Sequence, residues 1–176
     1  MRYLSAIWGI GGVLAILLFA VFRLAPIAEG ALSGPLAWYH WIFFVVWVAF
    51  MIFTEGIRGF HQAFSPRVVA RARALVTHPD LVAGLLAPFY CFGFFRATRK
   101  RRIVAWAVFG GILSLILLVR LLPQPWRGLV DAGVVAGLTI GAASILYYAG
   151  LWLLGRPGDH PPDLPETATP FDRAQS

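Results

Sequence analysis

Three ionisable side chains follow one another at three-residue spacing in the segment TEGIRGFH. They are Glu55, Arg58 and His61. A carboxylate and a guanidinium at positions i and i+3 of an α-helix neutralise each other, and an imidazole exchanges protons near neutral pH. The spacing predicts an ion pair between Glu55 and Arg58 at the point where a helix leaves a membrane. Because ionisable groups are costly in hydrocarbon, a proton or ion site is the alternative.

A second pair of opposite charges lies at the start of another apolar stretch. Asp131 is four residues beyond Arg127, which predicts an ion pair on one helix face, with Arg120 also in reach. A proton or ion site is again the alternative. The sequence contains no phosphate-binding loop, no GxSxG or HExxH motif and no paired carboxylates at catalytic spacing. We therefore lean against an enzyme, and a lipid-acting enzyme that uses Glu55 and His61 is a third hypothesis.

The histidines and the cysteine predict neither a cofactor nor a metal site. A b-type haem commonly needs two histidines at matching depth, and His40 lies at the outer end of its apolar stretch, away from the other three. Its neighbours Trp38, Tyr39 and Trp41 are typical of an aromatic belt. Cys91 is the single cysteine, which excludes an internal disulfide and a CxxC motif. Its apolar neighbours predict a packed structural thiol.

The elements that carry these groups are predicted to be membrane-spanning helices. Of the 176 residues, 59% are hydrophobic and 13% are charged, whereas about a quarter of a soluble domain is charged. Four apolar stretches are long enough to cross about 30 Å of hydrocarbon: residues 4–22, 36–54, 103–121 and 130–154. The first is longer than the core of a signal peptide, so we expect a retained helix. The sequence predicts an all-α integral membrane protein with one membrane domain over residues 1–155.

A fifth apolar segment, residues 81–95, is shorter than a span. It has 15 uncharged residues, and Pro88 in its middle removes a backbone donor and predicts a bend. We predict a short re-entrant or in-plane helix that returns to the side it came from. With that topology 12 of the 15 cations lie on one side, which the positive-inside rule assigns to the cytoplasm together with both termini. If the segment spans instead, this bias nearly disappears.

The charge and composition also bear on location and partners. Of the 15 cations only Lys100 is a lysine, and this arginine bias, with abundant alanine and glycine, indicates a bacterial protein of the inner membrane. The net charge of +7 is explained by cytoplasmic loops that touch anionic headgroups, so no nucleic acid partner is expected. The last residues, 156–176, are rich in proline and acidic side chains and predict a disordered cytoplasmic tail.

The connection over residues 57–102 is predicted to form a basic cytoplasmic platform. Ser65 and Pro66 predict a helix start, and Asp80 predicts a second one. The first of these helices has an apolar stripe and a basic back, which is typical of an interfacial amphipathic helix in a headgroup layer. Its basic residues are Arg67, Arg71 and Arg73. The cluster that ends the connection binds anionic headgroups or docks an acidic partner. Its members are Arg96, Arg99, Lys100, Arg101 and Arg102.

Three glycines recur every four residues in the last apolar stretch. They are Gly133, Gly137 and Gly141. Small residues at this spacing let another helix backbone approach closely. The pattern predicts a helix–helix contact, either within the chain, with residues 9–12 or 110–111 opposite, or with a protein partner or a second copy.

These observations lead to two main hypotheses about function. The first is a small multi-span accessory or scaffold subunit with a basic cytoplasmic platform that contacts membrane lipids. The alternative is a small oligomeric transporter or channel, in which Glu55, His61 or Asp131 lines a water-accessible path.

Overall fold

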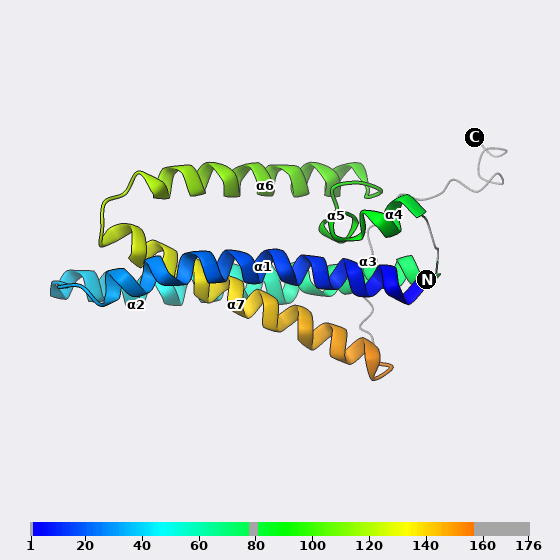
Figure 1. The fold of residues 1–176 in the computed structure, drawn as a ribbon, viewed down its shortest axis with the longest axis horizontal. Helices are drawn as coiled ribbons and strands as arrows, with labels where there is room; N and C mark the ends of the chain where they lie inside the picture. The colour runs from blue at the N-terminus through cyan, green and yellow to red at the C-terminus, as the bar shows by residue number, and fades with distance from the viewer. Residues whose placement is uncertain (1, 78–80, 157–176) are drawn as a thin grey trace.

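The computed structural model describes residues 2–77 and 81–156 of the chain (Figure 1). The described part consists of helices and turns, without a strand. The helices are α1 (Arg2–Leu32), α2 (Trp38–Met51), the π-helix η1 (Ile52–Phe64), α3 (Ser65–Thr77), α4 (Leu81–Leu85), α5 (Ala87–Phe92), α6 (Arg99–Arg120) and α7 (Trp126–Leu153). Within this part, four stretches are long and apolar enough to cross a membrane: Tyr3–Leu32, Trp38–Thr77, Arg102–Arg120 and Trp126–Leu153. The prediction of an all-α chain with four helices of this kind is confirmed. The predicted tail lies almost wholly outside the described residues, as does Asp80.

The first helix extends well beyond the predicted stretch. α1 continues through Pro26 to Leu32, so most of the connection expected after residue 22 is helical. A proline removes a backbone donor, but membrane helices tolerate it where neighbouring groups compensate. Ala28 and Ala31 are buried here, and a Cβ on Gly128 of α7 would collide with Ala31. Close packing against the start of α7 stabilises the helix beyond the proline.

The second helix does not end at Thr54 as predicted. It runs without interruption from Trp38 to Thr77, through α2, η1 and α3. Ser65 is not an N-cap, because its φ of −60° and ψ of −44° are helical. Its N–H donates to the carbonyl of Phe60, five residues earlier. Pro66, which has no N–H, therefore marks the change from π-helical to α-helical pairing and not a helix start.

The prediction that α3 is an interfacial helix is also wrong. Most of its side chains between Ser65 and Leu75 are buried, because α1, η1, α5 and α7 pack around it. The apolar face was identified correctly from the sequence, since Val68 and Ala72 are fully buried. The opposite face of α3 is covered as well, because α5 packs against α3. The hydrophobic periodicity of α3 does not show that another segment packs against its polar face.

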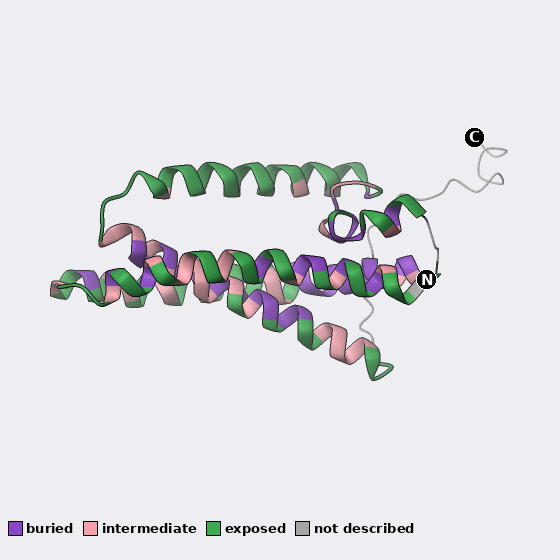
Figure 2. Cartoon of the chain, viewed as in Figure 1, coloured by how far each residue is buried: buried purple, intermediate pink, exposed green. Residues whose placement is uncertain are grey.

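The main core lies where α1, α3, α5 and α7 meet. Val13 of α1, Val68 of α3 and Ile145 of α7 are each 0% exposed. They belong to one apolar cluster with Ala87 and Cys91 of α5. Figure 2 shows several buried segments of the ribbon toward the end of the bundle that carries the N-terminus. The short helix α5 is therefore part of the core and not an appendage.

The short helices α4 and α5 lie beside the first turns of α1 (Figure 1). A Cβ on Gly12 would collide with Pro88, and one on Gly9 would lie 2.9 Å from Sγ of Cys91. Nε1 of Trp8 donates to the carbonyl of Leu85 at 3.1 Å. The helices have only five and six residues, and α6 begins at the same end of the molecule. Between residues 81 and 98 the chain thus stays at one end of the bundle.

The bend in this segment lies just before Pro88. Leu86, with φ −96° and ψ 29°, separates α4 from α5. Pro88 falls in the first turn of α5, where a missing N–H loses no hydrogen bond. α5 ends at Gly93, whose φ of +87° lies in the left-handed region that glycine adopts without strain. A proline and a glycine thus delimit α5.

α6 stands apart from the other helices over most of its length (Figure 1, Figure 2). None of the residues from Arg102 to Arg120 is buried. Near its start, the rings of Trp106 and Phe109 lie 4.9 and 5.5 Å from that of Phe94. A Cβ on Gly110 or Gly111 would meet nothing within 4 Å among the described residues. These two glycines are therefore not the partners of the α7 glycines.

Candidate functional site

The π-helix η1 contacts α7 at every fifth residue. In a π-helix each N–H bonds to the carbonyl five residues earlier and the turn is wider than in an α-helix, so residues four and five apart lie on one face. The two rows that meet α7 are Met51, Gly56 and His61, and Glu55, Phe60 and Ser65. In these rows, a Cβ on Gly56 would lie 2.9 Å from Cδ1 of Ile140. Ser65 donates to the carbonyl of Gly141 at 3.5 Å.

The glycines of α7 make this contact possible. A Cβ on Gly133 would lie 2.5 Å from Nε1 of Trp47, and one on Gly141 would lie 2.7 Å from the Phe60 ring. A Cβ on Gly137 would lie 3.2 Å from Cβ of Glu55. The predicted glycine contact is therefore found within the chain, between α7 and the helix formed by α2 and η1. A partner at this face would first have to displace that helix.

Glu55 and Arg58 do not form the predicted ion pair within the described part of the chain. Both side chains are exposed, and Cζ of Arg58 lies 5.1 Å from the ring centroid of Phe53, five residues earlier. The i, i+3 rule holds for an α-helix, and the wider π-helical turn brings i and i+5 together instead. This is the physical reason for the difference.

His61 contacts α7 at Ser144. Its Nδ1 shares a hydrogen bond of 3.2 Å with Oγ of Ser144, and the tautomer of the imidazole decides which atom donates. Ser144 is buried, whereas His61 is half-buried. The rings of Tyr147 and Tyr148 lie 5.9 and 5.4 Å from the imidazole. His61 therefore has a polar partner and an aromatic surrounding that the sequence did not indicate.

Asp131 and Arg127 form the predicted pair in the first two turns of α7. Nε of Arg127 lies 3.9 Å from Oδ2 of Asp131. Asp131 is only 5% exposed, and neither of these two atoms has a hydrogen-bond partner among the described residues. Arg120 is exposed nearby in sequence. The contact is a long ion pair inside the protein.

Arg71 of α3 is buried and bonds to backbone carbonyls. Its Nε donates to the carbonyl of Tyr90 at 2.6 Å, and one Nη donates to those of Phe95 and Arg96 at 2.9 and 3.2 Å. These carbonyls lie near and just beyond the end of α5, where unpaired acceptors and the negative end of the helix dipole favour a cation. With 3% exposure, Arg71 is not on the exposed basic face where the sequence placed it. It fastens α5 and the following loop to α3.

The titratable groups beside Arg71 stay neutral. Burial raises the pKa of the Cys91 thiol to about 12, and Arg71 opposes this shift in part. Burial also raises the pKa of Tyr90, again against the effect of Arg71. Neither group is charged at physiological pH, so carbonyl dipoles, and not a thiolate or phenolate, face the guanidinium. Cys91 is the packed thiol that its neighbours predicted.

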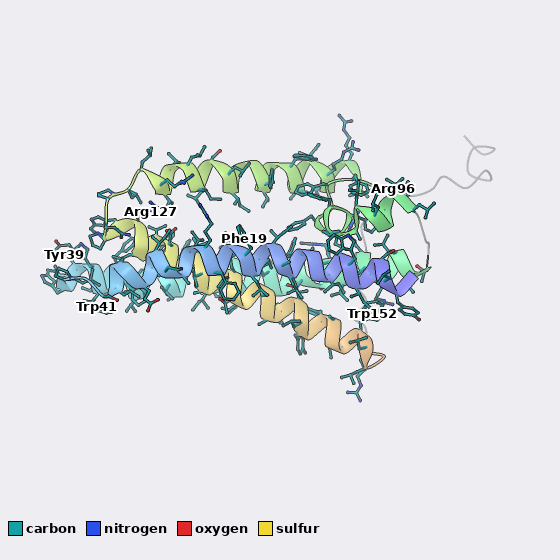
Figure 3. The ribbon with its side chains drawn as sticks, in the orientation of Figure 1. Phe19, Tyr39, Trp41, Arg96, Arg127 and Trp152 are labelled. Carbon is teal, nitrogen blue, oxygen red and sulfur yellow. The ribbon has the colours of Figure 1, made fainter. Side chains whose placement is uncertain are left out.

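Four exposed cations gather beside α4 and α5. Arg96, Arg99, Lys100 and Arg102 are exposed, and Figure 3 shows Arg96 at this end, opposite the end with Tyr39, Trp41 and Arg127. Two further cations, Arg67 and Arg73, are half-buried on α3. The side chain of Arg101 lies outside the described part.

No protein-family model, curated protein or solved structure matches this chain.

The ionisable groups singled out above do not converge on one centre. Glu55 lies opposite Gly137 and His61 lies opposite Ser144, two turns further along α7. The third candidate, Asp131, precedes both along α7. Within residues 2–77 and 81–156, no three His, Cys, Asp or Glu side chains come together as metal ligands would. The described residues provide charged and polar groups along η1 and α7, and a basic surface beside α4 and α5.

Several residues of this arrangement escaped the sequence analysis. The contacts of Phe60, Ser65 and Ser144 follow from the five-residue period of η1, and a wide-turn helix leaves no plain mark in the sequence. Tyr90 supplies a carbonyl to Arg71, and backbone acceptors carry no sequence signal. The α7 glycines did predict a close contact, but not which helix would fill it.

Proposed function

We propose that this chain is a small multi-span accessory or scaffold subunit of the bacterial inner membrane. Its basic end, formed by Arg96, Arg99, Lys100 and Arg102, faces the cytoplasm and contacts anionic headgroups or an acidic partner. The single observation that carries the proposal is the gathering of these exposed cations beside the short helices α4 and α5. Each cation near an anionic surface contributes about 1 kcal/mol of attraction.

The arrangement of the helices supports the proposed orientation. α1 and α6 begin, and α3 and α7 end, at the end of the bundle that carries the basic surface (Figure 1). With this end in the cytoplasm, both termini are cytoplasmic and residues 81–95 form a re-entrant or in-plane segment, in agreement with the positive-inside rule. Arg71 supports the platform by holding α5 and the Arg96 carbonyl in place.

Affinity purification in mild detergent tests this function. The unaltered chain should recover a partner at fixed stoichiometry together with anionic phospholipid. A variant in which Arg96, Arg99, Lys100 and Arg102 are replaced by glutamine should lose both. A control variant with glutamine at the exposed Arg23 and Arg120 should lose neither. Repeated recovery of a lone protein without bound lipid would contradict the proposal.

A second candidate is a small oligomeric transporter or channel. The observation that favours it is the hydrogen bond of His61 to Ser144, in a helix whose neighbouring turns expose Glu55 and Arg58. Polar groups along a membrane helix commonly mark ion and proton pathways. Ion or proton flux into liposomes that falls strongly with Glu55→Gln or Asp131→Asn would support this function, and unchanged flux would count against it.

A further inference from the structure

The exposed charges of η1 lie at hydrocarbon depth if α7 crosses the membrane. A span needs about 20 residues, and every stretch of that length within Trp126–Leu153 includes residues 134–145. Gly137 and Ser144 fall in this range, and Glu55 and His61 pack against them. Arg58 lies between Glu55 and His61 in the chain. Its charge and that of Glu55 are therefore inside the membrane and not at its surface.

The two charges lie at nearly the same depth. The side chain of Arg58 reaches back over the ring of Phe53, which precedes Glu55 by two residues. The guanidinium is thus displaced toward the depth of the Glu55 carboxylate, although the two groups do not meet within the chain. Ionisable groups at this depth are rare, and they usually pair with another polar group or line a water-filled cavity. Within residues 2–77 and 81–156, neither charge meets an opposite one, and a partner group from a second molecule would satisfy both.

The geometry of η1 defines the surface between these charges. Because the turn of η1 is wider than that of an α-helix, Thr54 and Gly59 lie between Glu55 and Arg58 around the helix, whereas Ile57 lies on the other flank of Arg58. Gly59 is exposed, and a Cβ at this position would meet only the carbonyl of Thr54 at 3.3 Å. The surface is therefore flat at its centre, with an acid on one side and a base on the other. A glycine at such a place lets another helix approach closely.

We propose that this surface binds a second copy of the chain in a parallel, twofold-symmetric dimer. Copies inserted the same way round present equal depths to each other, and a twofold axis along the membrane normal brings Glu55 of one copy to Arg58 of the other, twice. A surface that carries an acid and a base at one depth is complementary to the same surface of a second copy. The dimer neutralises all four charges, which neither a lipid tail nor an apolar helix does. This inference concerns the face of η1 and is independent of the basic end.

Cysteine cross-linking in native membranes tests the dimer. In a Cys91→Ala background, Gly59→Cys should form a disulfide-linked dimer on mild oxidation, since residue 59 lies near the axis. Ile57→Cys, on the other flank of the same turn, is the matched control and should give less than a tenth of that yield. Equal yields at both positions, or a cross-linked product with the mass of a different subunit, would overturn the proposal.

Charge exchange tests the pairing itself. Glu55→Arg or Arg58→Glu, each in the Gly59→Cys chain, should lower the dimer yield about tenfold, which corresponds to about 1.4 kcal/mol, because each single variant places like charges together at both symmetric sites. The double variant, with Glu55→Arg and Arg58→Glu together, should restore the yield to within about threefold, because the charges are again complementary. Yields that do not respond to charge, or a double variant that falls below both single ones, would contradict the pairing.

Discussion

The guanidinium of Arg71 lies 4.3 Å from the ring centroid of Tyr90, and its Nε donates to the carbonyl of the same residue at 2.6 Å. One side chain thus binds both the ring and the backbone of a residue 19 positions away. The cation–π contact and the hydrogen bonds are strengthened by burial, since little water competes for the guanidinium. This relationship joins α3 to the segment that the sequence predicted to be re-entrant.

Replacement of Arg71 should loosen this segment. Arg71→Ala removes one buried and two partly buried hydrogen bonds to carbonyls, at roughly 1 kcal/mol each, so we expect a loss of about 3 kcal/mol in the free energy of unfolding. Arg71→Lys should lose about half as much, because an ammonium does not reproduce the planar fork of the guanidinium. The midpoint of unfolding in mixed detergent and SDS, followed by tryptophan fluorescence, measures both.

The control for this prediction is Arg73→Ala, two residues along the same helix. Arg73 is half-buried, and its replacement should change the unfolding free energy by less than about 1 kcal/mol. If Arg71→Ala and Arg73→Ala behave alike, the carbonyl contacts do not stabilise the fold.

Cys91 should be inert to alkylation in the folded protein. Because burial raises the pKa of its thiol from 9.0 to about 12, the reactive thiolate at pH 7.5 is about a thousandfold rarer than in the unfolded chain. The folded state binds this proton more tightly, so the associated stability is complete below pH 9 and is lost as the pH rises toward 12. Iodoacetamide should label SDS-unfolded protein within minutes and leave the native protein unlabelled. Equal labelling rates in both states would show that the thiol is accessible.

Two adjacent glycines of α1 should respond differently to alanine. A Cβ on Gly12 would collide with Pro88, whereas one on Gly11 meets nothing within 4 Å. Gly12→Ala should therefore push α5 away from α1 and destabilise the protein by about 1–3 kcal/mol. Gly11→Ala should be neutral or stabilising by up to about 1 kcal/mol, since alanine favours helix. The same SDS titration compares the two, and equal effects would contradict the close contact.

The sequence predicted those parts of the fold that depend on hydrophobicity and charge. The four apolar helices follow from long uncharged runs, whereas the return of residues 81–95 to one side of a membrane, inferred from the positions of the arginines, stays a prediction. Helix ends were less predictable. α1 continues past residue 22 and through Pro26, and the second helix continues past Thr54 and through Pro66, because tertiary packing stabilises both beyond their predicted ends.

The candidate site was predicted less well, for a geometric reason. In an α-helix, with 3.6 residues per turn, Glu55 would lie against Arg58. In η1 the contacts of His61, Phe60 and Ser65 recur at five residues instead. The ion pair of Asp131 with Arg127 was predicted correctly because α7 is a regular α-helix, where i and i+4 are neighbours.

The orientation of the chain in the membrane can be measured at two exposed residues. Thr98 precedes α6 at the basic end, and Gln124 lies in the turn at its other end. In a Cys91→Ala background, a membrane-impermeant maleimide added to intact spheroplasts should label Gln124→Cys and leave Thr98→Cys unlabelled until the membrane is opened. The positive-inside rule requires this result, because the cations beside Thr98 resist transfer across the membrane. Labelling of Thr98→Cys from outside would reverse the orientation and remove the cytoplasmic platform, and labelling of both from outside would mean that α6 does not cross the membrane.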